Sequence, residues 1–93
     1  MPTYTAPTRD TKFVVNEVLE LPSYGNRPGF EAATADLIDT VIDECGKFAA
    51  EVLQPLNQVG DREGCTRHSD GSVTTPTGFK AAFDQYVEAG WST

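Results

Sequence analysis

Residues 30–56 read FEAATADLIDTVIDECGKFAAEVLQPL, and this stretch decides the fold. Its apolar residues recur at spacings of three and four, which is the period of an amphipathic α-helix with one buried stripe. The stripe comprises Leu37, Ile38, Val41, Ile42, Cys45, Phe48, Ala49, Val52 and Leu53. Acidic and other polar residues occupy the positions between, and we expect them to face solvent. The pattern therefore predicts one long helix.

Residues with strong conformational preferences mark the two ends of this helix. Thr34 is a good cap for the first turn, where the helix dipole favours a carboxylate such as that of Asp36. Pro55 lacks a backbone donor and clashes with the preceding turn, so we expect a kink or break there, followed by a short segment over residues 55–59. Gly46 has no side chain, which would allow close approach by another helix.

A shorter helix is predicted before this stretch. It begins near Thr8 or Asp10, either of which can cap exposed backbone N–H groups, and it ends before Pro22. Its apolar face carries Phe13, Val14, Val18 and Leu21. Residues 22–30, PSYGNRPGF, contain two prolines and two glycines and are expected to form a loop.

A hairpin and a last helix are predicted after it. Residues 60–64, GDREG, are expected to form a polar turn, and Asp70-Gly71 is a two-residue hairpin signal between short β-prone flanks. The helix follows Thr75-Pro76, with the proline near its first turn, and ends at Gly90. Its apolar side carries Phe79, Phe83, Tyr86 and Val87, and Trp91 follows as an apolar anchor. The sequence thus predicts one all-α domain over residues 1–93, a small bundle of three to four helices with a short hairpin or irregular loop near residues 65–75.

Composition limits the range of partners. The chain has 93 residues with 7 Lys and Arg against 14 Asp and Glu, a formal net charge of -7. Such a charge repels phosphate backbones and anionic lipid surfaces, so neither nucleic acid nor a membrane is expected as a partner. A DNA-binding helix-turn-helix is also disfavoured, because the chain has no basic recognition helix.

The cellular compartment follows from two further features. No apolar run approaches the ~20 residues that span a bilayer, and the polar opening residues do not resemble a signal peptide. We therefore expect a cytoplasmic protein. Cys45 and Cys65 form no CxxC pair and are expected to be free thiols, with Cys45 buried as a small hydrophobe on the apolar stripe.

Residue patterns typical of catalysis are absent. The one histidine, His68, is followed directly by Ser69 and Asp70, and three adjacent side chains cannot form the relay that a serine nucleophile requires. We expect an exposed polar loop there. The carboxylates over residues 36–51 lie between the apolar positions and are interpreted as an ordinary solvated face, because paired catalytic acids need one member in a cleft.

Metal, nucleotide and carrier-protein patterns are also missing. One His and two separated Cys do not supply zinc spacing. A calcium loop starting at Asp61 would place Thr66 and Ser72 where glycine and glutamate are required, so Asp61 and Glu63 are interpreted as solvated turn acids. No glycine-rich phosphate loop occurs. An acyl carrier protein would need serine within Asp-Ser-Leu at a helix start, where this chain has Asp36 followed by leucine.

Four groups of motifs occur in order: YxAPxxDxxF and NEVL at residues 4–19, FAxEVLxPLN and GDxEGC at 48–65, DGxVxxPxGF at 70–79, and ExGW at 88–91. Together they resemble the opening of FAD-dependent acyl-CoA dehydrogenases, over essentially the whole chain. Within that family they are most similar to the subgroup that acts on methylmercaptopropionyl-CoA and related acyl-CoAs.

The resemblance implies a parent oxidoreductase of fatty acid metabolism with an amino-terminal helical domain, a middle β-domain and a carboxy-terminal helical bundle, with FAD between the later two. A glutamate from the later region would remove an α-proton from the acyl-CoA thioester while the flavin accepts a hydride from the β-carbon. Residues 1–93 would be the amino-terminal domain of a longer chain, packed on the other two domains and helping to wall the acyl pocket. No catalytic, cofactor-binding or metal residue is assigned to it, and alone it is expected to be inactive.

An alternative stays open, in which the chain is a free-standing small acidic helical module that binds partner proteins through its apolar faces. If other domains normally cover those faces, the isolated chain should self-associate. The aromatic residues that support this expectation are Phe13, Phe79, Phe83, Tyr86 and Trp91.

Overall fold

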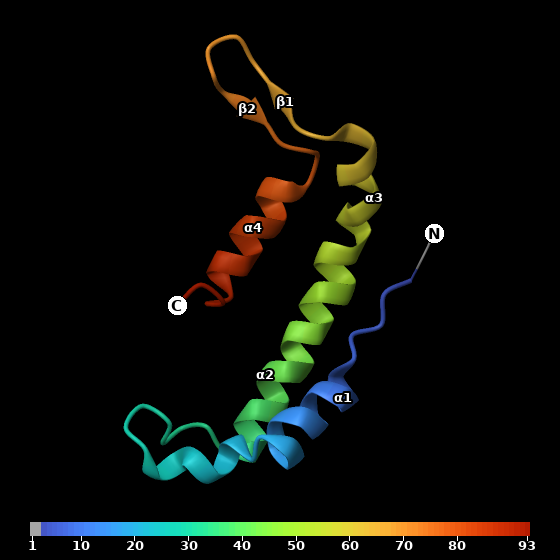
Figure 1. The fold of residues 1–93 in the computed structure, drawn as a ribbon. Helices are drawn as coiled ribbons and strands as arrows, with labels where there is room; N and C mark the ends of the chain where they lie inside the picture. Colours follow the sequence, from blue (N-terminus) through green and yellow to red (C-terminus); the bar gives the residue numbers. More distant parts are fainter. Residues whose placement is uncertain (1–2) are drawn as a thin grey trace. The chain divides into compact units, whose positions relative to one another are not determined.

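The computed structural model describes residues 3–93 and forms two compact units, Met1–Ala50 and Glu51–Thr93 (Figure 1). Over the described residues the chain has four α-helices, joined in places by π-helical and 3-10 turns, and one two-stranded antiparallel sheet. The predicted all-α fold with a small hairpin is therefore confirmed.

The first helix is shorter than predicted and changes its winding. Helix α1 spans Thr8–Phe13 and continues as the π-helical turn η1, Val14–Val18. Thr8 and Asp10 do not cap it, because the cap position is occupied by Pro7 and no side chain bonds there. The helix also stops well before Pro22. The reason is local, since Glu20 adopts a left-handed conformation with φ 51° that no α-helix can continue through.

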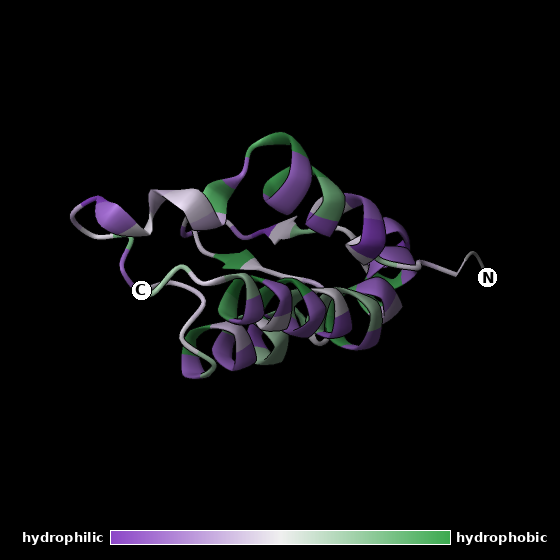
Figure 2. Ribbon diagram, turned by 90° about the horizontal axis from the view of Figure 1, so that it is seen from below, coloured by the Kyte–Doolittle hydropathy of each residue, from purple (hydrophilic) through white to green (hydrophobic). Residues whose placement is uncertain are grey.

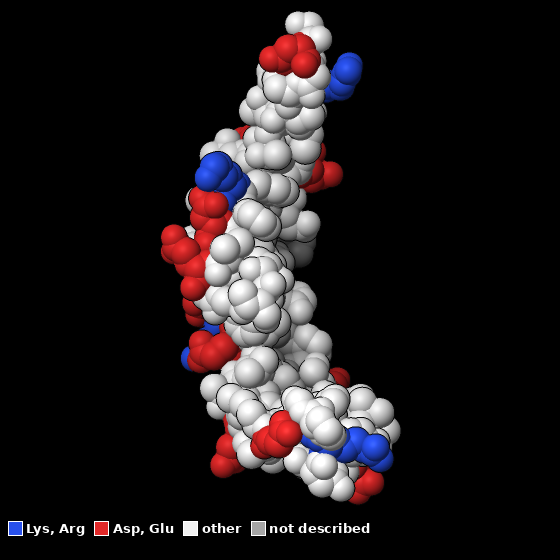
Figure 3. All heavy atoms as spheres, turned by 90° about the vertical axis from the view of Figure 1, so that its left-hand side faces the viewer, with Lys and Arg blue, Asp and Glu red and all other residues white. Residues whose placement is uncertain are grey.

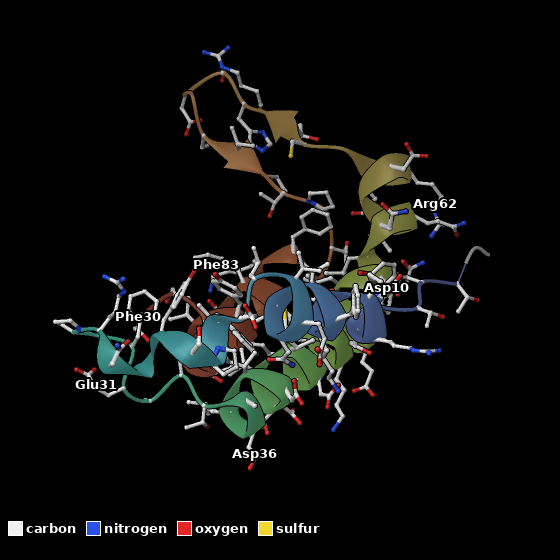
Figure 4. All side chains as sticks on the ribbon, turned by 60° about the horizontal axis from the view of Figure 1, so that its bottom comes forward. Asp10, Phe30, Glu31, Asp36, Arg62 and Phe83 are labelled. Carbon is white, nitrogen blue, oxygen red and sulfur yellow. The ribbon has the colours of Figure 1, made fainter. Side chains whose placement is uncertain are left out.

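Part of the predicted loop at residues 22–30 is helical. The 3-10 helix η2 spans Leu21–Asn26 with Pro22 in its first turn. Proline lacks the backbone donor that would be unpaired there, so it opens this helix rather than closing the previous one. The chain then turns, and the Glu31 carboxylate accepts a hydrogen bond of 3.0 Å from the backbone N–H of Gly29 (Figure 4).

The main helix begins as predicted. Helix α2 spans Ala35–Phe48, and the Thr34 hydroxyl accepts the Leu37 N–H at 3.3 Å. The expected break before Pro55 is a π-helical turn, η3, over Ala49–Leu53. Helix α3, Gln54–Glu63, follows with Pro55 in its first turn.

The predicted polar turn over residues 60–64 is wrong, because α3 continues to Glu63. Arg62 and Glu63 are good helix formers, and the turn signal was carried mainly by the two glycines. Of these, Gly64 does end the helix, with φ 62°. Gly60 is helical and has a packing role.

Within the first unit, α1 lies along α2 (Figure 1). The prediction of close approach at Gly46 is confirmed, since a Cβ there would lie 2.9 Å from Thr8 Cγ2 and 3.1 Å from Ala6 Cβ. Because α1 rests on the Gly46 side of α2, the apolar stripe is only partly covered. Leu37 and Val41 are 47% and 45% exposed, contrary to the prediction that the whole stripe is buried.

The second unit contains the predicted hairpin. Strands β1, Thr66–Arg67, and β2, Val73–Thr74, pair antiparallel. The His68 N–H bonds to the Ser72 carbonyl at 2.8 Å, and the Gly71 N–H bonds to the His68 carbonyl at 3.0 Å. With Gly71 at φ 89°, this is a three-residue loop ending in a left-handed glycine, rather than the two-residue turn suggested by Asp-Gly.

Helix α4, Phe79–Glu88, packs within the same unit. Its capping residue is Gly78 with φ 88°, so Pro76 lies before the helix and not in its first turn. The predicted end is confirmed: Gly90 has φ 85°, and the N–H of Trp91 bonds to the Tyr86 carbonyl at 3.2 Å. This is the hydrogen-bond pattern of a Schellman motif.

Glycines again mark the close contacts of this unit. A Cβ on Gly60 would lie 2.7 Å from Phe79 Cζ, and one on Gly78 would lie 2.8 Å from Leu56 Cδ2. Among the described residues, only Pro76 and Ala82 are classed as buried. Hydrophobic and hydrophilic residues alternate along the helical ribbons (Figure 2). Many of the large hydrophobic side chains are exposed.

Replacing Gly46 with valine should destabilise the first unit by about 1–3 kcal/mol, because the new side chain overlaps Thr8 and Ala6. Chemical denaturation followed by circular dichroism would measure the change. Adding Thr8→Ser, which removes the Cγ2 atom, should recover part of the loss. Gly25→Ala is the control, since its Cβ would meet nothing nearer than 4.0 Å. Equal stability of the Gly46 variant and the control would contradict the packing described.

Candidate functional site

Hydrogen bonds within the hairpin occupy the residues that most resemble a catalytic group. His68 Nε2 lies 2.6 Å from Thr74 Oγ1. Asp70 Oδ1 accepts bonds from the Ser72 hydroxyl at 2.6 Å and the Ser72 N–H at 2.9 Å. Both bonds hold the pKa of Asp70 below its usual value, and the bond from the Ser72 hydroxyl has the larger effect. His68 and Asp70 thus bond to different residues, and both stabilise the turn.

Contrary to the prediction, two carboxylates of α2 do not face solvent. Lys12 Nζ lies 2.8 Å from Asp43 Oδ1, and Asn16 Nδ2 donates to Asp39 Oδ1 at 2.8 Å. Both acids are half-buried because they share the Gly46 side of the helix, against which α1 packs. The periodicity could not show this, since polar residues are assigned to solvent when the position of the neighbouring helix is unknown.

Asn16, the first residue of the NEVL motif, had no predicted contact. Its Oδ1 atom is buried and has no hydrogen-bond partner among the described residues. The motif marks the residue, but no local pattern shows that its side chain contacts α2. Its position depends on the π-helical turn η1, which contains it.

The remaining acids of α2 are exposed. Glu44 pairs with Lys47 at 3.1 Å, one turn away along the same helix. Asp36, in the first turn, points away from the ribbon (Figure 4). Acidic atoms are more abundant than basic atoms on the face drawn in Figure 3. The interpretation as a solvated acidic face therefore holds for these two residues.

Glu63 is exposed, as predicted, but it lies at the end of α3 rather than in a turn and has hydrogen-bond partners. Its carboxylate accepts the Thr77 N–H at 2.7 Å and the Thr77 hydroxyl at 3.0 Å. The two bonds fasten the segment before α4 to the end of α3. Asp61, with which Glu63 was grouped, is exposed.

Metal-ligating and thiol groups are dispersed. Between residues 3 and 93, no three or more His, Cys, Asp or Glu side chains come together in a way that could hold a metal ion. Cys45 and Cys65 are free, as predicted, but both are exposed. The predicted burial of Cys45 is wrong, because α1 covers the Gly46 side of α2 and not the Cys45 side. None of the helices described is both long enough and apolar enough to span a membrane.

Exposed apolar side chains on the helices are the most distinctive surface features. On the first helix, Phe13, Val14, Val18 and Leu19 are 58%, 44%, 60% and 56% exposed, and we call them the outer patch. On α4, Phe83 is 62% exposed, and its ring stacks on that of Tyr86 with centroids 6.4 Å apart. Such surfaces suit contact with other protein surfaces rather than chemistry.

Comparison with known proteins agrees with the motifs. No protein-family model matches the chain. However, the chain is 35% identical over 89 residues to 3-methylmercaptopropionyl-CoA dehydrogenase of Ruegeria pomeroyi. The aligned segment covers 96% of this chain but only 15% of that protein. The predicted resemblance to an acyl-CoA dehydrogenase is therefore confirmed, and the chain corresponds to a small part of its relative.

Glu63→Ala should lower the free energy of unfolding of the second unit by about 0.5–1.5 kcal/mol, because two hydrogen bonds to Thr77 are lost at an exposed site. Asp61→Ala, in the same turn of α3, is the matched control and should change stability by less than about 0.5 kcal/mol. Denaturant titration followed by Trp91 fluorescence would compare them. Similar destabilisation by both substitutions would show that the Glu63 contact has no special role.

Proposed function

We propose that residues 1–93 form the amino-terminal helical domain of a longer flavin-dependent acyl-CoA dehydrogenase, in which they act as a scaffold. The observation that carries this proposal is the 35% identity to an acyl-CoA dehydrogenase along 96% of the chain. The 15% of that relative which is covered fits one domain of a larger enzyme. The reaction would be the α,β-dehydrogenation of an acyl-CoA thioester.

The exposed apolar faces support a scaffolding role. Hydrophobic surface is costly to leave in water, and large contiguous patches on soluble proteins mark places where another surface binds. Here the outer patch and the Phe83 side of α4 would pack against the middle and carboxy-terminal domains. Part of this surface would also help to wall the acyl pocket.

The starts of α2 and α4 offer a flavin little to bind. A flavin dinucleotide carries a pyrophosphate, which proteins commonly bind at a helix amino terminus with free backbone donors. The start of α2 is capped by Thr34, and the approach to α4 is held by the Glu63 carboxylate, whose charge would repel a phosphate. FAD and the catalytic base would therefore come from other parts of the enzyme, and these residues would contribute position and packing.

Flavin content would test the proposal. A polypeptide extended through the remaining domains should purify with flavin absorbance and reduce a dye when an acyl-CoA is added. The chain of residues 1–93, purified in the same way, should be colourless and inactive. An extended polypeptide that never takes up flavin would overturn the proposal and leave the free-standing interaction module as the explanation.

The isolated chain should also self-associate, because the apolar faces that other domains would cover remain in water. Sedimentation velocity over a range of concentrations should show species larger than a monomer. Phe83→Glu, which places a charge on the α4 face, should shift the distribution toward monomer. A single monomeric species at high concentration for the unmodified chain would contradict this expectation.

A further inference from the structure

The π-helical turn η1 adds Leu19 to the outer patch. The Leu19 N–H bonds to the Val14 carbonyl at 2.8 Å, five residues back. In this wider turn residues five apart lie near each other along one side of the helix, which brings Val18 near Phe13 and Leu19 near Val14. Isolated π-helical turns occur frequently at functional sites. The α-helical period already places Phe13, Val14 and Val18 on one face, and the π-helical turn adds Leu19 to it.

Acidic residues edge the patch. Asp10, Glu17 and Glu20 are exposed, and none of the three has an ion-pair partner among the described residues. Asp10 lies on α1 (Figure 4). Of the two cations on this helix, Lys12 is held by Asp43 on the opposite side, which leaves Arg9. The edge is therefore predominantly negative.

The size of the patch bears on the kind of partner. A stable interface between separate proteins usually takes about 20–30 residues from each side. The outer patch offers four side chains, too few to hold an independent partner. A surface on the same polypeptide needs less, because a covalent tether raises its effective concentration.

We propose that the outer patch docks onto an apolar surface edged by Lys or Arg on a later part of the same polypeptide. This inference rests on the proposed function, since it takes residues 1–93 to be one domain of a longer enzyme. The four exposed side chains, among them Leu19 at the end of the π-helical turn, supply the apolar centre. Asp10, Glu17 and Glu20 supply the charges that the basic edge of the partner surface would complement.

Other apolar faces are less specific. On α2, the carboxylates Asp39 and Asp43 already bond within the unit, and Glu44 pairs with Lys47. Their charges are therefore partly balanced within the unit. The side of α2 that carries Leu37 and Val41 gives little indication of what would cover it. The outer patch combines uncovered hydrophobic side chains with an edge whose charges are predominantly negative.

Hydrogen exchange in the flavin-loaded extended polypeptide would test the proposal. Backbone amides of residues 13–19 should exchange about tenfold or more slowly there than in the isolated chain. Val18→Asp should abolish that difference, because docking would bury a charge. Glu17→Lys with Glu20→Lys should weaken it, because the charges would then repel a basic edge.

Val73→Asp is the matched control, since Val73 is 55% exposed on the hairpin and Val18 is 60% exposed. It should leave exchange at residues 13–19 unchanged. Circular dichroism of the isolated Val18→Asp chain should match that of the parent chain, which would show that α1 still forms.

The outcomes separate the two proposals. If the extended polypeptide binds flavin and dehydrogenates acyl-CoA, yet residues 13–19 exchange as fast as in the isolated chain, the docking proposal fails and the proposed function stands. If those amides are protected in a polypeptide without flavin or activity, the proposed function fails instead. Protection that depends on protein concentration would assign the patch to a second copy and overturn the tethered partner.

Discussion

Close approach at glycines determines how the helices of this chain pack. Gly46 brings α2 against Thr8 and Ala6, and Gly60 receives the ring of Phe79 within the second unit. A missing side chain lets two elements approach without a large apolar interface between them. The apolar stripes are consequently spared from much of the internal packing, and they stay available for other surfaces.

Features that depend on nearby residues could be predicted from the sequence. The Thr34 cap acts on the N–H of Leu37, three residues away, and the Gly90 ending joins Trp91 to Tyr86, five residues away. The helices, the hairpin and the close approach at Gly46 follow from such patterns. The exposure of Cys45 could not be predicted, because periodicity identifies an apolar face without showing whether this chain covers it.

At the outer patch, too, a local sequence pattern could not predict everything. The α-helical period correctly placed Phe13, Val14 and Val18 on one face but added Leu21 where the structure has Leu19. The difference is the π-helical turn, which coincides with the bond from Asn16 to Asp39, 23 residues along the chain. A contact of that range leaves no trace in a local pattern.

The acids that pack against α1 contribute less than their geometry suggests. Lys12 and Asp43 are 31% and 48% exposed, so water screens their pair, which is worth about 0–1 kcal/mol. The polar contacts therefore orient α1 on α2, while the steric fit at Gly46 provides the packing.

The energy available at the outer patch favours a tethered partner over a free one. Fully burying an apolar side chain of this size gains about 1.5–3 kcal/mol, and each of the four is already about half covered, which leaves roughly 4 kcal/mol in all. This is an upper bound, since docking need not cover the four side chains completely. Between separate molecules, roughly 4 kcal/mol corresponds to a dissociation constant of about 1 mM. Between parts of one polypeptide the same energy suffices to keep them docked, because the tether removes most of the entropy cost of association.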